Sequence, residues 1–242
     1  MSAATAPTVD TTIGQLVADR PARSRLFEKL GIDYCCGGKR TLADACQAKG
    51  LDAKTVAQLL VAADDTVPTA GAVDAAAMSL TQLADHIEQT HHQYLKRELP
   101  RLSPLVEKIA AKHGPAHPNL AQLSHVFAAF REELESHMMK EERILFPMIR
   151  QIDAHPTSAG GFHCGSIDNP IRVMELEHQH AGDAMEQMRA LTEGYSAPAD
   201  ACNTYRAVMQ SLAEIETDMH QHVHKENNVL FPRASRAASG GY

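Results

Sequence analysis

Tryptophan is absent from this chain, and aromatic residues make up only 5% of its 242 positions. Alanine, leucine, methionine and glutamate are abundant instead, and because these residues favour helices the composition predicts an all-α protein. With 44% apolar and 22% charged residues, the chain otherwise has the composition of an ordinary globular protein. Its length suits one large domain, or a small domain joined to a medium one.

Three further absences narrow the class of protein. No apolar run approaches the roughly 18–20 residues that a membrane-spanning helix requires, so no membrane partner is expected. The first ten residues have neither a basic start nor an apolar core, so no signal peptide is expected. Acidic residues outnumber basic ones by 30 to 23, which gives a net charge of −7. This balance argues against a nucleic-acid partner, because phosphate backbones are met by an excess of Lys and Arg.

Cysteine is also scarce: there are five, an odd number, without the pattern of a disulfide framework. The sequence therefore predicts a soluble protein of a reducing compartment. Two of the five, Cys35 and Cys36, are adjacent, and neighbouring cysteines bridge each other only through a strained ring. Because Gly37, Gly38 and Lys39 follow and a helix is expected soon after, these are candidate redox thiols with a lowered pKa. Packed, unreactive thiols are the alternative.

Histidine is unevenly distributed: there are 14, and the first is His86. Beyond that point the chain repeats a motif. His137 is followed by Glu141 and then by Leu-Phe-Pro, and 85 residues later His222 is followed by Glu226 and again by Leu-Phe-Pro. Four residues turn a helix through about 400°, so each His and its Glu lie one turn apart on the same face.

Another histidine precedes each copy of the motif. His92 stands 45 residues before His137, and His178 stands 44 residues before His222. We interpret each half as a helical hairpin that supplies two histidines and one glutamate, a ligand trio typical of non-haem iron. Two such halves predict a dinuclear metal site.

The helix signals divide the chain into two units. Residues 9–66 are expected to form a small helical N-terminal domain with the Cys-Cys-Gly-Gly loop, its later helices capped by Thr41 and Asp52. Residues 67–78, mostly small and with one proline and one glycine, are expected to be a linker. Residues 79–236 are expected to form four long helices with short connections, which predicts an antiparallel four-helix bundle.

Capping and turn residues delimit these four helices. Ser79, with Gln82 three residues on, is a good cap for the first helix, and Asn169-Pro170 is a good start for the third. Pro147 and Pro232 are expected to kink the second and fourth helices just past their ligands. The expected spans are 79–112, 119–152, 169–194 and 198–236, with a longer loop over 153–168.

At about 100° per residue, both His/Glu pairs lie in the middle of an apolar stripe. Around His222 the stripe contains Leu212, Ile215, Met219, Val229 and Leu230, and around His137 it contains Val126, Phe127, Phe130, Leu134, Ile144, Leu145 and Met148. A charged glutamate inside such a stripe is costly unless it is paired or bound to a metal. The pattern therefore favours metal ligands over surface ion pairs.

Periodicity leaves the ligand of the first helix open, because the apolar stripe of that helix is centred nearer His91, with His92 on its flank. Glu88-x-x-His91 and Glu175-x-x-His178 also resemble the Glu-x-x-His pairs of ferritin-like carboxylate sites. The spacing of the repeat favours His92 over His91, because His92 is one residue closer to the 44-residue spacing between His178 and His222.

Other histidines carry weaker signals. On the fourth helix, His220 and His224 lie about 160° from His222 and are expected to be solvated. His163 and Cys164 fall in the glycine-rich loop over 153–168 and are expected to have no metal or redox role.

Four histidines and two bridging glutamates offer eight donor atoms, whereas two octahedral ions have twelve positions. About four positions therefore remain for an oxo or hydroxo bridge and for a small ligand such as O₂, NO or peroxide. A structural zinc site would instead be closed and four-coordinate, usually with cysteine. Hydrolysis by two zinc or manganese ions is a weaker alternative, because a bundle interior does not readily provide a substrate cleft.

Several long motifs of the chain are similar to those of one family. The segments starting at Asp33 (DYCCGGK), Ser136 (SHMMKEE), Val173 (VMELEH) and Glu226 (ENNVLFPRA) resemble the repair-of-iron-centres family, the YtfE/ScdA/DnrN/NorA group. The resemblance implies a haemerythrin-like four-helix bundle with a non-haem di-iron centre, preceded by a small helical domain. It also implies cytoplasmic action under nitrosative and oxidative stress, in the repair of damaged iron–sulfur clusters.

Matched to this chain, the family's ligand pattern falls on His92, His137, Glu141, His178, His222 and Glu226, with the two glutamates bridging. The spacing to Leu99-Pro100 selects His92 over His91 in this pattern. The resemblance thus implies two non-haem irons with an oxo or hydroxo bridge, NO or reactive oxygen species as ligands, and damaged iron–sulfur proteins as clients. A sensor, carrier or scavenger of NO or O₂ without turnover needs the same site and is the alternative. The sequence neither requires nor excludes a homodimer.

Overall fold

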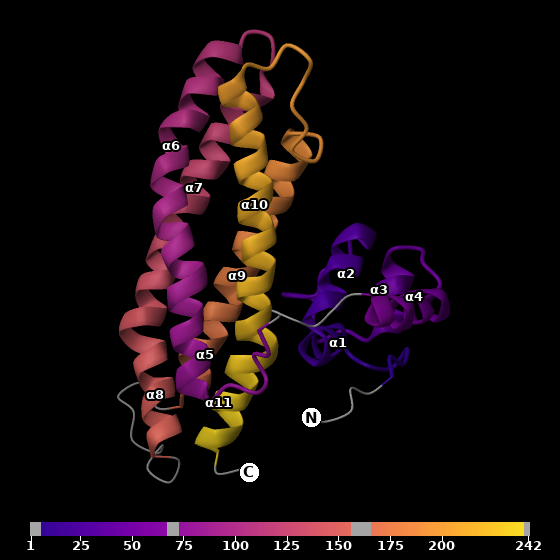
Figure 1. Ribbon diagram of the computed structural model, residues 1–242. Helices are drawn as coiled ribbons and strands as arrows, with labels where there is room; N and C mark the ends of the chain where they lie inside the picture. The colour runs from indigo at the N-terminus through magenta and orange to yellow at the C-terminus, as the bar shows by residue number, and fades with distance from the viewer. Residues whose placement is uncertain (1–5, 67–72, 156–165, 240–242) are drawn as a thin grey trace.

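The computed structural model describes residues 6–66, 73–155 and 166–239, and within these ranges the chain forms helices and no strands. Long helices run side by side as a bundle, and the N-terminal helices lie against one side of it, next to α10 (Figure 1). The all-α fold expected from the composition is confirmed. None of the described helices is long and apolar enough to cross a membrane.

The N-terminal unit is a small group of short helices around its own core. Its helices are α1 (Ile13–Asp19), the 3₁₀ turn η1 (Pro21–Arg23), α2 (Ser24–Leu30), α3 (Leu42–Ala48) and α4 (Ala53–Thr66). The predicted caps are present: the Thr41 hydroxyl accepts from the Asp44 amide, and the Asp52 carboxylate accepts from the Thr55 amide. The core is apolar except for buried Arg23, which forms an ion pair with Asp64 and so ties α4 to the first helices.

Three of the four long helices of the bundle contain one π-helical turn each. The segments are α5 (Leu80–Ile87), η2 (Glu88–His92) and α6 (Gln93–His113); α7 (Asn119–Lys140), η3 (Glu141–Leu145) and α8 (Phe146–Ala154); α9 (Asp168–Leu191); and α10 (Asn203–Lys225), η5 (Glu226–Leu230) and α11 (Phe231–Ala238). The predicted capping box of Ser79 and Gln82 opens α5. Helix α7 packs against α6 and α9, and α10 packs against α6.

The π turns change which side chains face the core. Pro147 and Pro232 each stand at the second position of the helix that follows a π turn, where a missing backbone N–H is tolerated. The wider turn adds a residue and shifts the helical phase, since a π turn bonds i to i+5. Ile144, which the 100° count placed in the apolar stripe, is 53% exposed as a result. That placement was wrong because the count assumed an uninterrupted α-helix.

Two predicted helix starts also differ from the structure. The third long helix begins at Asp168, one residue before the expected cap at Asn169, and the fourth begins at Asn203, five residues after Pro198. Residues 67–72 of the predicted linker lie outside the described ranges. The same holds for 156–165 of the predicted loop, which include His163 and Cys164. The proposed domain boundaries remain predictions.

Asn228 fixes the N-terminal unit to the bundle. Its side-chain amide donates to the backbone carbonyls of Tyr34 and Cys35, at 3.3 Å and 2.9 Å. A Cβ added to Gly14 or to Gly38 would come within 2.2 Å of Asn228 Oδ1. These two glycines therefore provide the space that the Asn228 side chain occupies.

His224 is part of the same interface, which corrects one expectation. We expected His220 and His224 to be solvated, but His224 is buried and its ring packs edge-on against Tyr34 at a centroid distance of 5.5 Å. His220 is partly covered by the same tyrosine. The helix face opposite the predicted ligands is not a solvent face, because the N-terminal unit covers it.

Candidate metal centre

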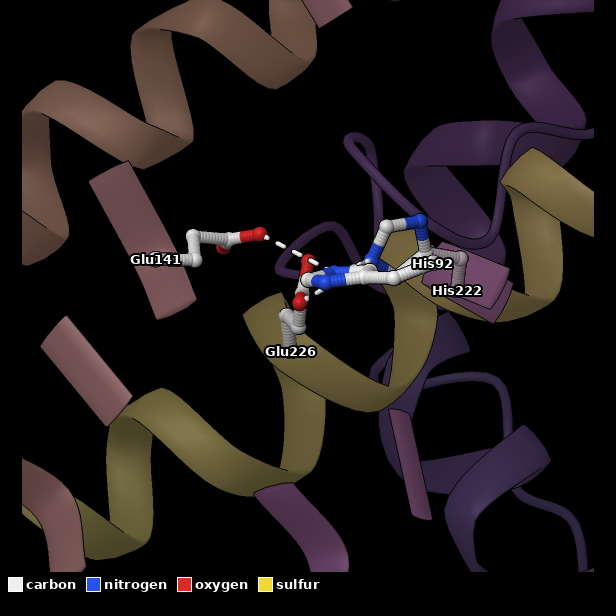
Figure 2. A group of neighbouring side chains, drawn as sticks. All are labelled: His92, Glu141, His222 and Glu226. Atoms are coloured by element: carbon white, nitrogen blue, oxygen red, sulfur yellow. Dashed lines mark hydrogen bonds and ion pairs between the residues drawn. The ribbon is translucent and has the colours of Figure 1, made fainter. Parts of the chain in front are cut away.

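Six buried side chains converge in the bundle as two overlapping groups. One consists of His92, Glu141, His222 and Glu226, and the other of His137, Glu141, His178 and Glu226; within each, the ligand atoms lie within 4.8 Å of one another. In Figure 2 the first group is seen to converge on one point from separate helical segments. Both glutamates belong to both groups, which is the arrangement that a dinuclear site with two bridging carboxylates requires.

The π turns deliver the ligands to this point. His92 is the last residue of η2, whereas Glu141 and Glu226 are the first residues of η3 and η5. Such π-helical bulges often occur at functional sites. Each of the three interrupted helices therefore changes its phase at the level of the site.

The spacing of the imidazole nitrogens matches that of ligands to a shared ion. The Nε2 atoms of His92 and His222 are 3.2 Å apart, and those of His137 and His178 are 3.1 Å apart. Two nitrogens that each lie about 2.1 Å from one ion, at right angles, are about 3 Å apart. The two histidine pairs therefore have the separation expected of ligand pairs.

Three of the four histidines are held by an acceptor at the opposite ring nitrogen. His92 Nδ1 donates to Glu142 at 2.8 Å, His137 Nδ1 donates to Glu177 at 3.0 Å, and His178 Nδ1 donates to the side-chain oxygen of Asn227 at 2.8 Å. A proton held at Nδ1 leaves the Nε2 lone pair facing the centre, which is the tautomer that binds a metal.

His222 is the exception, and its neighbour explains why. In the second half, Glu177 directly precedes His178 and accepts the hydrogen bond from His137. In the first half, the residue that directly precedes His92 is His91, which is not a carboxylate. His91 stacks on the His222 ring at 5.3 Å and an interplanar angle of 4°. Nδ1 of His222 has no hydrogen-bond partner among the described residues.

The unsatisfied carboxylate oxygens provide a test of whether a metal fits. Glu141 and Glu226 are completely buried, yet both oxygens of Glu141 and Oε2 of Glu226 lack a hydrogen-bond partner in the described chain. Glu226 Oε2 and Glu141 Oε2 instead lie 3.0–3.3 Å from imidazole Nε2 atoms without hydrogen-bond geometry. Buried, unpaired carboxylates are costly unless a cation neutralises them, so a cation suits this donor set.

The pKa values of the metal-free site follow from the same contacts. Burial alone would lower the pKa of His92 and of His137, but the carboxylates around them have the larger effect. Glu141 and Glu142 raise the pKa of His92 to about 9. Glu141 and Glu177 raise the pKa of His137 to about 10. Burial raises the pKa of Glu226, but His222 and His178 lower it well below its ordinary value. Protons on His92 and His137 therefore take the place of a metal at neutral pH.

Metal loading is consequently expected to release protons and to tighten with pH. His92 and His137 belong to different groups, and each holds a proton up to about pH 9. The affinity for each Fe(II) should therefore rise under anaerobic conditions by up to about tenfold per pH unit between pH 6.5 and 8.5, because one of these protons leaves for each ion. Competition with a chromophoric chelator measures this slope. Without metal, the raised pKa values stabilise the fold fully below pH 6.5, and this contribution is lost as the pH rises through 9 to 10.

A matched variant separates this effect from general titration. Glu177→Gln removes one contact that raises the pKa of His137, so its affinity should rise less steeply with pH. An affinity for Fe(II) that is independent of pH in the wild-type chain would contradict the assignment.

The structure separates the alternatives that periodicity left open. His92 lies in the convergent group, whereas His91 lies outside it and donates from Nδ1 to Asp218 at 2.8 Å. The glutamates of the two Glu-x-x-His patterns are used elsewhere: Glu88 pairs with Arg150 and Glu175 pairs with Lys39. The role of the six convergent residues as ligands remains a prediction, which this geometry supports.

The Cys35-Cys36 loop lies against the site. The Cys36 thiol donates to the backbone carbonyl of His178 at 3.6 Å, and both thiols are free, with 4.0 Å between the sulfurs. The expectation of a lowered pKa was wrong for Cys35: its contact with the Cys36 thiol, together with burial and Asp33, raises the pKa of Cys35. Although Asp33 lies close to both thiols, its carboxylate accepts from the amides of Cys35, Cys36 and Gly37, so it serves as a turn-former.

Sequence reasoning missed the two residues that follow the glutamates. Glu142 and Asn227 stand at the same position of the repeat. Each accepts a hydrogen bond from a histidine on the preceding long helix of its own hairpin, His92 and His178 respectively. Their equivalent positions can be seen when the two copies of the motif are aligned. The equivalence gives a weak signal because Glu and Asn differ in type, although the side chains of both can accept a hydrogen bond.

Comparison with known proteins agrees with this description. The family profile described as "Hemerythrin HHE cation binding domain" matches residues 83–234, and a domain of unknown function (DUF542, ScdA_N) matches residues 9–64. Three proteins called "Iron-sulfur cluster repair protein YtfE" are similar over nearly the whole length. The protein of Enterobacter sp. (strain 638) is 38% identical over 226 residues, 93% of this chain and 96% of its own. That of Salmonella schwarzengrund (strain CVM19633) is 37% identical over 227 residues (93% and 96%), and that of Musicola paradisiaca (strain Ech703) is 38% identical over 231 residues (94% and 97%).

Proposed function

The chain belongs to the haemerythrin-like repair-of-iron-centres family, and we propose that it is a non-haem di-iron protein that supports the repair of damaged iron–sulfur clusters. The observation that carries the proposal is the pair of His₂Glu₂ groups that share both carboxylates. The relatives named for iron–sulfur cluster repair cover 93% of the chain, including the Cys-Cys loop, so the proposal applies to the bundle and the N-terminal unit together.

In this proposal His92 and His222 hold one iron, His137 and His178 hold the other, and Glu141 and Glu226 bridge them. Bound iron would supply coordination positions for NO or a reactive oxygen species and electrons for redox chemistry. The protein's own part is to hold the imidazoles in the tautomer that presents Nε2 and to keep the carboxylates ionised and away from water. Glu142, Glu177 and Asn227 perform the first task through their hydrogen bonds.

A cavity gives small ligands a route to the site. It encloses about 490 Å³ between α7 and α9, and His137 and His178 form part of its wall. Phe130, Leu134 and Ala181 make one side apolar, whereas Lys140 and Glu177, which pair with each other, stand beside His137. The other lining residues include Glu132, Glu133, Ser136 and His180, so the cavity has one apolar and one polar side. A small diatomic molecule such as NO would fit along the apolar side.

The docked thiol loop favours repair over simple carriage of NO or O₂. Cys36 lies against the backbone of a proposed ligand, His178, and this contact supports a role of the thiol in exchanging electrons with the site or in receiving iron from it. A carrier or sensor needs only the bundle. The damaged iron–sulfur proteins would be the clients of this reaction.

A repair assay tests the proposal. The anaerobic chain with about two irons, a thiol reductant and an NO-damaged [4Fe–4S] enzyme should restore the activity of that enzyme, and NO should convert the iron signal to an iron-nitrosyl signal. Cys35→Ser with Cys36→Ser should keep the iron but lose most of the repair, because only the loop is changed. Cys46→Ser, a buried cysteine of the N-terminal core, is the matched control and should repair normally. A wild-type chain that binds NO but repairs nothing would establish the carrier alternative instead.

A further inference from the structure

A second cavity lies between the N-terminal unit and the bundle. It encloses about 540 Å³, a volume typical of small-molecule sites. One wall comes from α1, η1 and α2, with Val17, Pro21 and Arg25, and the other comes from the bundle, with His86, His91 and Lys225. Both units are needed to form it.

The charges of this cavity are unlike those of the rest of the protein. The chain as a whole carries −7, yet the lining contains two cationic side chains, Arg25 and Lys225, and no Asp or Glu among the described residues. The imidazoles of His86, His91 and His224 also line the cavity, and burial lowers the pKa of His86 and that of His224 to about 4. The positive charge of the lining therefore rests on Arg25 and Lys225.

Lys225 and Arg25, the two cations of the cavity, lack the carboxylate partners that several lysines near the proposed metal site have. Lys39, Lys96 and Lys140 each form an ion pair with a glutamate. Within the described chain, by contrast, neither Lys225 nor Arg25 forms an ion pair. Lys225 is half-buried, and the carboxylates of Asp218 and Glu226 act on its charge without forming an ion pair with it. Burial of a cation without a paired anion is unfavourable, and a bound anion would relieve that cost.

Lys225 is held in place by two imidazoles. Its ammonium nitrogen lies 2.6 Å from Nε2 of His91 and 3.2 Å from Nε2 of His86. An ammonium group has three N–H donors, so one donor remains after these two contacts. Asp218 bonds the opposite nitrogen of the His91 ring, one imidazole away from the ammonium group. The arrangement orients Lys225 and leaves it able to meet a ligand.

We propose that this interdomain cavity binds a small organic oxyanion, with Lys225 and Arg25 holding the anionic group and the apolar residues of α1, η1 and η5 holding the rest. Val17, Ala18, Pro21, Ala22 and Val229 supply the apolar surface. An amphipathic anion therefore fits better than an inorganic ion. The bound molecule would bridge the N-terminal unit and the bundle and would contact His91, which stacks on His222.

Calorimetric titration of the iron-loaded, full-length chain tests the proposal with phenyl phosphate as the probe. One site per chain is expected, with phenyl phosphate bound more tightly than inorganic phosphate and with phenol, its neutral counterpart, not bound. Arg25→Gln and Lys225→Gln should each weaken phenyl phosphate by about tenfold or more, because each removes a charge-assisted hydrogen bond. Lys39→Gln, which removes a lysine that pairs with Glu175 outside the cavity, should bind like the wild type.

Two outcomes would overturn the proposal. One is the absence of saturable phenyl phosphate binding. The other is binding that Arg25→Gln and Lys225→Gln both leave unchanged, which would place the anion elsewhere, for instance at the irons. Lys225 adjoins Glu226, so iron content is measured in every variant. Arg25 belongs to α2 and to neither metal group, so the binding measured for its variant does not depend on a change at the metal site.

Discussion

Replacing Glu226 with Gln is expected to remove most of the iron that the wild-type chain retains on desalting. Glu226 is fully buried and belongs to both convergent groups, with its oxygens 3.0 Å from His178 Nε2 and 3.1 Å from His222 Nε2. The substitution therefore removes an anionic ligand from both irons at once. Loss of a residue that merely orients a ligand typically costs 10–100-fold in metal affinity, so loss of a shared ligand should cost more than about 100-fold. Glu141→Gln should behave in the same way.

The amide variants separate a lost ligand from a lost fold. In the metal-free chain the carboxylates are the costly buried groups, and Gln has nearly the same shape, so circular dichroism should show a folded, iron-poor protein. Glu175→Gln is the matched control: it lies one turn before His178 but pairs with Lys39 outside the groups, and it should keep its iron. Elemental analysis measures the outcome. Full iron in both Glu141→Gln and Glu226→Gln would end the di-iron assignment.

The second large effect is expected at Gly38. Replacing Gly38 with Ala should release the Cys35-Cys36 loop from the bundle, because the new Cβ would lie 2.2 Å from Oδ1 and 2.7 Å from Cγ of Asn228. Asn228 has a short side chain, and it can move only by giving up its bonds to the carbonyls of Tyr34 and Cys35. Overpacking of this kind costs about 1–3 kcal/mol. We expect modification of Cys36 by a thiol reagent to become at least about tenfold faster, as 1.4 kcal/mol corresponds to tenfold in the docking equilibrium.

A double-mutant cycle isolates this contact. Asn228→Ala also weakens docking by removing two hydrogen bonds, but in that background Gly38→Ala should add less than about 0.5 kcal/mol, because the atoms it would strike are gone. Gly50→Ala is the control: Gly50 has a φ of 67° and open space around it, so the variant strains the N-terminal unit without disturbing the interface. Cys36 should then react at the wild-type rate. Additive effects of Gly38→Ala and Asn228→Ala would show that the two residues do not meet.

Much of the proposed site was visible in the sequence because its signals are local. His and Glu four residues apart lie on one helix face wherever the helix is placed, and the repetition of His137/Glu141 as His222/Glu226 indicated two halves of one site. Helix caps such as Ser79 and Asp52 are also local, since the cap side chain bonds an amide three residues away. These features depend on neighbours along the chain, and so they could be predicted from it.

Periodicity alone could not place His92 instead of His91 in the group, although the repeat spacing and the family's ligand pattern both selected His92. The 100° count centred the first helix on His91, but the π turn over Glu88–His92 shifts the phase and brings His92 to the centre. The same shift in η3 turns Ile144 outward. A π turn has no local sequence signal of its own, because it is stabilised by what the shifted side chains reach across the bundle. Periodicity therefore failed at the level of the site, where these turns occur.

The contacts between distant segments were likewise beyond the sequence. His224 is buried because Tyr34, 190 residues earlier, covers it. Asn228 and Gly38 meet because the N-terminal unit packs against the bundle, and the basic cavity exists only where the two leave a space. The chain by itself determined its helices, their caps and the repeated His/Glu pairs, since each arises from residues within a few turns of one another. Only the tertiary structure decided where the helices change phase and which surfaces are covered, because these depend on the energies of contacts between residues far apart in the sequence.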